Sequence, residues 1–241
     1  MMHFFRKPTI HLDAFTTRKD VIEYAPVVNG IEKIPTWWKN LPKSYVAPNS
    51  FFPQATMKGC VGLSNYYNKS VAMPMWSDLS VNVSQNEGYQ WQFSDGTSTA
   101  DVHSNKQFEG FNLNGFSHLK LNSPWFFETK KDIEWMVSCP IYNLENHTDF
   151  VFPQGLLNFK RQYVTNIQLL LNTTQSRTFV IPFGTVFLFT PLSDSKVVIH
   201  RHLITEEQHK LKTQKSMLNT FINKYQIHNR AQKCPYKDET K

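Results

Sequence analysis

The chain has 241 residues, 40% of them hydrophobic and 14% aromatic, with 19 phenylalanines and 9 glycines. This length fits one large domain, and this apolar content can bury a sizeable core, which argues against a disordered chain. The formal net charge of +7 comes from the ends: residues 44–205 carry 11 basic and 11 acidic side chains, residues 1–43 carry 7 and 4, and residues 206–241 carry 8 and 4. Basic termini could contact nucleic acid or an acidic partner. Neither has the dense, aromatic-interleaved run of a dedicated groove, so a solvated surface is the simpler interpretation.

The three cysteines, Cys60, Cys139 and Cys234, lie far apart in the sequence. An odd number without C-x-x-C spacing argues against a disulfide framework and a zinc site, and predicts free thiols in a reducing cytoplasm. Cys139 precedes a proline in an apolar run and is interpreted as a small buried hydrophobe. No window reaches the roughly 18 apolar residues of a membrane span. The N-terminus lacks the apolar segment of a secretory signal, so we expect no membrane partner.

The first segment, residues 1–54, is predicted to contain an edge strand over 8–15 and short helices over 17–24 and 34–42. The adjacent Trp37 and Trp38 must both find cover in the last of these. We interpret the pair as a plug that seals one edge of the core, with an exposed aromatic platform as the alternative.

The central segment, residues 55–204, is predicted to be the β core. Its apolar, β-branched and aromatic runs are cut by Pro, Gly and Asn at the spacing of antiparallel strands. The polar stretch 101–118 is the expected irregular functional loop, because loops carry function more often than cores. Strands are predicted over residues 71–83, 89–93, 125–129, 133–141 (as the hairpin mate of 125–129), 150–157, 164–171 and 178–189.

The last segment, residues 205–241, is predicted to contain a helix that runs to about residue 228. Thr205 and Gln208 match a capping box at its start. Apolar residues then recur on one side, which makes the helix amphipathic; they are Leu211, Leu218, Phe221, Ile222 and Tyr225. Packing on the core is the default, and a partner or subunit interface is the alternative. The predicted fold is therefore mainly β: an antiparallel β-sandwich or jelly-roll-like core with short N-terminal helices and one C-terminal amphipathic helix.

One pattern suggests metal chemistry. His147-Thr-Asp149 is followed about fifty residues later by His200. A His-x-Asp and a distant His on a jelly roll can form the facial triad of a non-haem Fe(II) oxygenase, so these three residues are the candidate metal ligands and Fe(II) is the candidate cofactor. The basic residue that would bind the carboxylate of 2-oxoglutarate is Lys210 or Lys212, both inside the predicted helix.

Other catalytic patterns are missing. The sequence contains neither a Gly-x-Ser-x-Gly nucleophile turn nor a Gly-rich phosphate loop. A second His-x-Asp, His11-Leu-Asp13, shows how readily that pattern arises by chance. We therefore name no catalytic residue and treat the oxygenase as the alternative to a non-enzymatic protein.

The order Gly155-Leu-Leu-Asn158, Tyr163, Asn166, an apolar strand and then Ile181-Pro-Phe-Gly184 resembles the late part of the dUTPase-type β-fold. In that family an Asp in the matching turn activates water. The matching residue here, Asn158, cannot act as a general base, so the resemblance supports a β-fold and counts against that activity. It leaves a small-molecule or nucleotide-binding β protein as a third interpretation.

Several motifs, in order, resemble an uncharacterised family of tailed phages, especially T4-like phages of marine cyanobacteria. They run from about residue 30 to the C-terminus and include Ile34-Pro-Thr-Trp-Trp-Lys39, Met57-Lys-Gly-Cys60, Asn122-Ser-Pro-Trp125, Ser138-Cys-Pro-Ile141, Ile181-Pro-Phe-Gly-Thr185 and Phe221-Ile-Asn-Lys-Tyr225. The chain departs from the family at Thr129-Lys-Lys-Asp-Ile-Glu134 and Leu157-Asn-Phe-Lys160, where relatives carry a Pro-Gly turn and acidic residues. The resemblance implies a viral origin and a single β-sandwich-like domain, and supplies no activity.

The expected function is therefore that of a non-enzymatic phage protein, either a virion component or a binding and assembly module. Its expected partners are further copies of itself or other phage proteins. Its expected location is the host cytoplasm or the virion.

Overall fold

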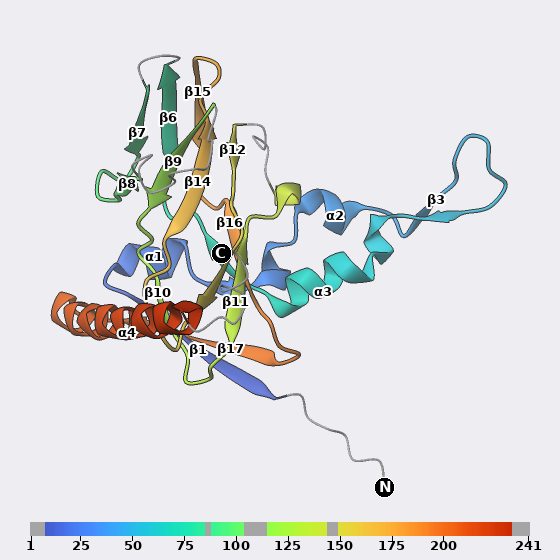
Figure 1. The fold of residues 1–241 in the computed structure, drawn as a ribbon. Helices are drawn as coiled ribbons and strands as arrows, with labels where there is room; N and C mark the ends of the chain where they lie inside the picture. The colour runs from blue at the N-terminus through green and yellow to red at the C-terminus, as the bar shows by residue number, and fades with distance from the viewer. Residues whose placement is uncertain (1–7, 85–87, 104–114, 144–148, 233–241) are drawn as a thin grey trace, which may run out of the picture.

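In the computed structural model, residues 8–84, 88–103, 115–143 and 149–232 are described. The chain folds mainly into β-strands, with one long helix at the C-terminal end (Figure 1). The strands are β1 (Thr9–Thr16), β2 (Val28–Asn29), β3 (Ser44–Tyr45), β4 (Gln54–Ala55), β5 (Val71–Pro74), β6 (Leu79–Ser84), β7 (Gly88–Phe93), β8 (Ala100–Val102), β9 (Phe116–Leu121), β10 (Phe126–Glu128), β11 (Glu134–Ser138), β12 (Phe150–Val151), β13 (Gly155–Asn158), β14 (Ile167–Asn172), β15 (Arg177–Ile181), β16 (Val186–Pro191) and β17 (Lys196–Leu203). The helices are α1 (Lys19–Tyr24), η1 (Gly30–Lys33), α2 (Thr36–Asn40), η2 (Met57–Gly59), α3 (Val61–Lys69), η4 (Ile141–Asn143) and α4 (Glu206–Gln232).

The strands form several small sheets rather than one large one. Their orders are β13-β11-β16-β5-β2, β12-β14-β9-β8, β15-β6-β7 and β10-β1-β17, with β3-β4 as a separate hairpin. One large apolar cluster draws residues from the four larger sheets, which is a sandwich-like arrangement. The predicted fold class, mainly β with antiparallel sheets and a C-terminal helix, is confirmed.

Aromatic rings fill the centre of the core. Phe127 on β10 meets Phe159 and Phe189 edge-on, with ring centroids 5.2 and 5.1 Å away. Trp135 on β11 packs against Phe159 at 5.5 Å. Tilted and edge-to-face contacts of this kind are the favoured geometry for aromatic pairs, which explains how a phenylalanine-rich, glycine-poor chain packs its interior.

Strand β1 lies between β10 and β17, and its predicted edge position is wrong. It pairs antiparallel with β10 and parallel with β17, in a register that sets Leu12 beside Ile199. Alternate residues Ile10, Leu12 and Ala14 are fully buried, so one face of the strand enters the core. Hydrophobic alternation shows which face of a strand is buried, but not how many strands it pairs with. Here the second neighbour, β17, comes from the opposite end of the chain.

Two predicted strands are each divided between two sheets. The run 71–83 becomes β5 and β6, which lie in different sheets because the chain turns between Met75 and Leu79. The run 150–157 becomes β12 and β13. The predicted hairpin of 125–129 with 133–141 is also wrong, since β10 pairs with β1 whereas β11 pairs with β13 and β16.

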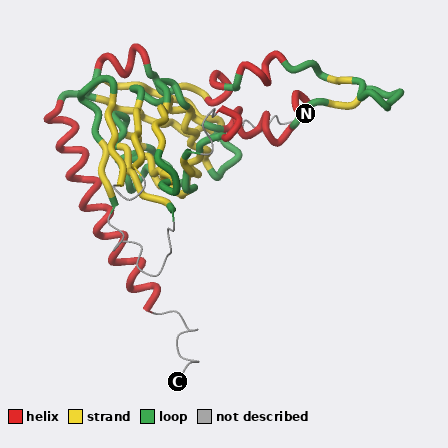
Figure 2. Tube along the Cα trace, turned by 90° about the horizontal axis from the view of Figure 1, so that it is seen from above, coloured by secondary structure: helices red, strands yellow, loops and turns green. Residues whose placement is uncertain are grey.

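Residues 36–69 form a projection from the sheets that we call the arm. It consists of α2, the β3–β4 hairpin, η2 and α3, and it extends well beyond the body of the protein in Figures 1 and 2. The sequence did not predict α3. Few residues in the sequence indicate this helix. Leu63 and Tyr67, at i, i+4 spacing, are its buried residues, and the Cys60 sulfur caps it by accepting a hydrogen bond from the Leu63 N–H at 3.4 Å.

Helix α4 begins at the predicted capping box. The Thr205 hydroxyl accepts a hydrogen bond from the Gln208 N–H at 3.2 Å, and the Gln208 side chain accepts one from the Thr205 N–H at 3.1 Å. The first half of α4 lies against β10 and the turn at residues 159–163, and the second half runs beyond the sheets (Figure 2). In the part of the chain that the structure describes, no helix has the length and apolarity of a membrane span.

Candidate functional site

The predicted Fe(II) ligands have different surroundings. His147 lies outside the described residues. The Asp149 carboxylate forms an ion pair with Arg177 at 2.7 Å, and His200 on β17 contacts His11 on β1. Among the described residues, no group of three or more His, Cys, Asp or Glu side chains is arranged to hold a metal ion. The trio therefore stays a prediction.

His200 belongs instead to a polar ladder on the outer face of β1 and β17. The His11 Nδ1 and His200 Nε2 atoms are 2.9 Å apart, so one ring donates a hydrogen bond and the other accepts it. Next along the strands, the Asp13 carboxylate lies 2.8 Å from His202 Nε2, and Phe15 stacks on the His202 ring at 4.8 Å. The second His-x-Asp of the sequence thus joins His200 and His202 in one exposed row.

Asn158, which the sequence resemblance would match to an Asp of the dUTPase-type fold, organises a turn in this structure. Its side-chain amide donates to Asp132 at 2.7 Å, and its carbonyl oxygen accepts from the Lys160 N–H at 3.1 Å. Arg161 donates to the other Asp132 oxygen, also at 2.7 Å. These bonds from Arg161 and Asn158 lower the pKa of Asp132, so the acid stays ionised and fixes the turn.

A small cavity of about 100 Å³ lies where this turn meets α4 and the end of β10. Four basic side chains and one carboxylate line it: Lys160, Arg161, Lys212, Lys215 and Glu128. Its basic side chains come from both the turn and the helix.

Tyr163 also lines this cavity. Its side chain is only 5% exposed, and its ring stacks on Phe126 with centroids 5.1 Å apart. Its hydroxyl is buried without a hydrogen-bond partner among the described residues. Burial, with a smaller effect from nearby Glu128, raises the pKa of Tyr163, so the hydroxyl keeps its proton and remains a donor.

The side of α4 that faces the sheet is polar. Lys212 forms an ion pair with Glu128 at 2.6 Å and lies 4.0 Å from the centre of the Phe15 ring. The Ser216 hydroxyl accepts a hydrogen bond from the Tyr163 N–H at 2.9 Å. The predicted packing of the apolar helix face on the core is therefore not what the structure has.

The opposite side of α4 is apolar and exposed. Leu211, Leu218 and Ile222 are 62%, 66% and 52% exposed, and their i, i+7, i+11 spacing sets them in one stripe. We call these three residues the α4 stripe.

The arm carries a second exposed apolar surface. Trp38 is 6% exposed and packs in a small cluster at the base of the arm, separate from the main core, whereas Trp37 is 43% exposed and packs on Tyr142 with centroids 5.8 Å apart. At the tip of the arm, Phe51 and Phe52 are 98% and 78% exposed. The two tryptophans therefore do not act as one plug: Trp38 is covered and Trp37 is half-exposed.

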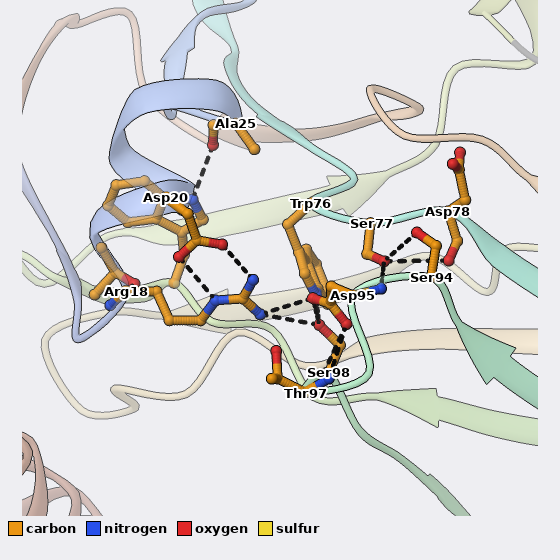
Figure 3. A network of polar contacts seen from close by, with 12 residues as sticks. Arg18, Asp20, Ala25, Trp76, Ser77, Asp78, Ser94, Asp95, Thr97 and Ser98 are labelled. Carbon is orange, nitrogen blue, oxygen red and sulfur yellow. Dashed lines mark hydrogen bonds and ion pairs between the residues drawn. The ribbon is translucent and has the colours of Figure 1, made fainter.

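A network of polar contacts joins α1 to the turn after β7 (Figure 3). The Arg18 guanidinium bridges Asp20 at 2.5 Å and Asp95 at 2.9 Å. Ser98 donates to Asp95 at 2.6 Å and accepts from the Trp76 indole N–H at 2.9 Å. Burial acts to raise the pKa of Asp95, but the hydrogen bonds from Ser98 and Arg18 outweigh it and bring that pKa to about 2. These groups are paired with one another, so we assign the network a structural role.

Sequence reasoning missed the basic cavity. Its cations come from Lys160-Arg161 and from Lys212 with Lys215, about fifty residues apart, and neither pair is a motif. The pattern that could have indicated it is the i, i+3 spacing of Lys212 and Lys215, which places both lysines on the same side of the helix.

Comparison of the chain with protein-family models, with curated proteins and with solved structures finds no match.

Proposed function

We propose that the chain is a non-enzymatic binding or assembly protein of a tailed phage, and that it associates with a second copy of itself through the α4 stripe. The observation that carries this proposal is the inverted arrangement of α4, with polar contacts toward the sheet and Leu211, Leu218 and Ile222 toward solvent. The phage origin is supported by the motif resemblance. The exposed Phe51 and Phe52 of the arm provide a second surface for other partners.

The spacing of the apolar residues along α4 suits pairing with the same helix of a second copy. Leu211 and Leu218 are seven residues apart, and the sequence repeats that interval at Tyr225. Apolar residues at seven-residue intervals are what two α-helices share when they pack along their length. The second half of α4 runs beyond the sheets (Figure 2).

Two copies that pack stripe against stripe are related by a two-fold axis. Such an interface is symmetric, so one stripe serves both copies.

The test is the molecular mass of the purified full chain in solution, measured by light scattering and sedimentation over a range of concentrations. We expect a dimer that dissociates on dilution. Leu218→Glu should give a monomer with an unchanged circular dichroism spectrum, because it puts a charge in the centre of the stripe. Leu192→Glu is the matched control, since Leu192 is 54% exposed on the loop after β16 and lies outside α4.

A chain that stays monomeric at every concentration would overturn self-association, and equal dissociation of both variants would move the interface away from α4. The virion version of the proposal has its own test, which is mass spectrometry of purified particles of the phage that encodes the chain. A stoichiometric signal supports a virion component. Its absence from the particles leaves a role in the infected cell and removes the structural one.

A further inference from the structure

The arm is basic along its whole length. Residues 36–69 contain four lysines and no Asp or Glu. Lys69, at the end of α3, forms an ion pair with Asp194 at 3.0 Å, whereas Lys39 and Lys43 are exposed. The part of the arm that projects from the sheets is therefore a cationic surface, and its charge favours an anionic partner.

Exposed aromatic rings occur from the base of the arm to its tip. Trp37 on α2 and Tyr45 on β3 are 43% and 49% exposed, and Phe51 and Phe52 in the loop beyond β3 are 98% and 78% exposed (Figure 1). A ring exposed in this way is available to stack with another flat group. The arm thus combines positive charge with aromatic surface.

The polar edges of two of these rings are already used inside the protein. The Trp37 indole N–H donates a hydrogen bond to the Tyr142 carbonyl at 3.0 Å, and the Tyr45 hydroxyl donates one to the Gln54 side chain at 2.8 Å. What the two side chains offer to a partner is therefore ring surface. At a membrane surface, Trp and Tyr are used differently, because their polar edges lie among water and lipid headgroups.

An open hollow of about 670 Å³ brings the rings and the lysines together. Trp37 and Tyr45 line it, and Lys43 and Lys58 each fall between lining residues in the sequence. The Lys58 ammonium donates a hydrogen bond to the Trp38 carbonyl at 3.1 Å. Its charge is therefore held beside the hollow by a main-chain carbonyl rather than by a carboxylate.

We propose that the arm binds single-stranded nucleic acid, with bases stacked on Tyr45, Phe51 and Phe52 and with Lys39 and Lys43 against the phosphates. Sites for single strands combine a positively charged groove with aromatic side chains on which bases stack. A duplex keeps its base faces inside the helix, and an acidic protein segment offers charge without flat groups. Binding by the arm assigns a partner to the second surface of the proposed function, and is independent of self-association because the α4 stripe lies on another element.

Fluorescence anisotropy of a labelled oligothymidylate, titrated with the full chain at several salt concentrations, tests this binding. The single strand should bind more tightly than the same strand paired with oligoadenylate. Each phosphate contact adds about 0.7 to the slope of log affinity against log salt for a single strand, so Lys43→Gln should reduce that slope by about this amount. Lys130→Gln, an exposed residue on the loop after β10, is the control and should leave it unchanged.

Substitutions of Phe51 separate stacking from simple apolar contact. The side chain is 98% exposed, so they leave the fold intact. Phe51→Tyr keeps the ring and should bind like the native chain. Phe51→Leu keeps an apolar side chain without a ring, and should weaken binding by about tenfold. Phe183→Leu is the matched control, since Phe183 is 46% exposed outside the arm.

Native affinity in Phe51→Leu would overturn the stacking assignment. Tighter binding of the duplex would mean general attraction to phosphates and would also overturn it. So would the absence of binding to the oligothymidylate, and sedimentation of the chain with phosphatidylserine vesicles in that case would identify a membrane surface instead. Leu218→Glu should bind the oligonucleotide like the native chain, and a loss of binding in that variant would move the surface from the arm to α4.

Discussion

The Arg18–Asp95 contact makes the most quantitative prediction about stability. Asp95 has a pKa of about 2, against 3.8 for the free side chain, and its side chain is 19% exposed. Each unit of pKa is worth about 1.4 kcal/mol, so ionised Asp95 contributes about 2 kcal/mol to the free energy of unfolding. Because the pKa is lower in the folded state, this contribution is complete above about pH 5 and is lost as the pH falls toward 2.

Asp95→Asn removes the ionisable group while keeping its shape. Urea unfolding followed by tryptophan fluorescence should show the variant less stable than the native protein by about 2 kcal/mol at pH 6. The difference should shrink as the pH falls toward 2, where Asp95 is half protonated in the folded protein, and should vanish below that pH. Asp101→Asn is the control. Asp101 is 55% exposed and pairs with Lys120 at the surface, so its loss should cost less than about 1 kcal/mol. A stability difference for Asp95→Asn that does not change with pH would refute the reasoning.

Three further predictions concern particular positions. Trp38→Ala should lower the free energy of unfolding by about 3–5 kcal/mol, because Trp38 is 6% exposed. Trp37→Ala should lower it by less than about 1 kcal/mol. Equal losses in chemical denaturation would contradict the conclusion that only Trp38 is buried. Gly30→Ala should lower the free energy of unfolding by about 1–3 kcal/mol, since its added carbon would lie 2.6 Å from a backbone oxygen of α3. Gly59→Ala is the control: its added carbon would have no atom within 4 Å, so the change should be less than about 0.5 kcal/mol. Cys139 should resist iodoacetamide at pH 8 until the protein unfolds, because burial raises its pKa to about 12; rapid alkylation of the native chain, read by peptide mass spectrometry, would disprove this.

The sequence predicted those parts of the fold that depend on local pattern. The capping box at Thr205, the helix it starts, the strand over residues 164–171 and the turn at Gly184 all lie where the residue types require them. The pairing of strands was not predictable in the same way. Whether β1 lies at an edge, and whether β10 pairs with β11, depends on contacts between residues far apart in sequence, which hydrophobic alternation does not encode.

The candidate site was harder to predict for a related reason. His200 was identified, but its contact with His11 arises only because the first and last strands are neighbours. The basic cavity likewise exists because a turn and a helix about fifty residues apart meet. The amphipathic pattern predicts that α4 has an apolar side and a polar side. The pattern does not predict which side packs on the protein, and in the structure the polar side does.

The inverted packing of α4 predicts a helix that is docked less firmly than the core is packed. Its contact with the sheet contains the buried Nδ1 of His209 and the buried hydroxyl of Thr213, both without hydrogen-bond partners among the described residues, and a buried group of this kind costs about 1–3 kcal/mol. Amide hydrogen exchange should therefore be faster in the first half of α4 than in β11 and β16, because the helix can leave the sheet without unfolding of the core. Equal protection of the helix and these strands would mean that α4 is docked as firmly as the core is packed.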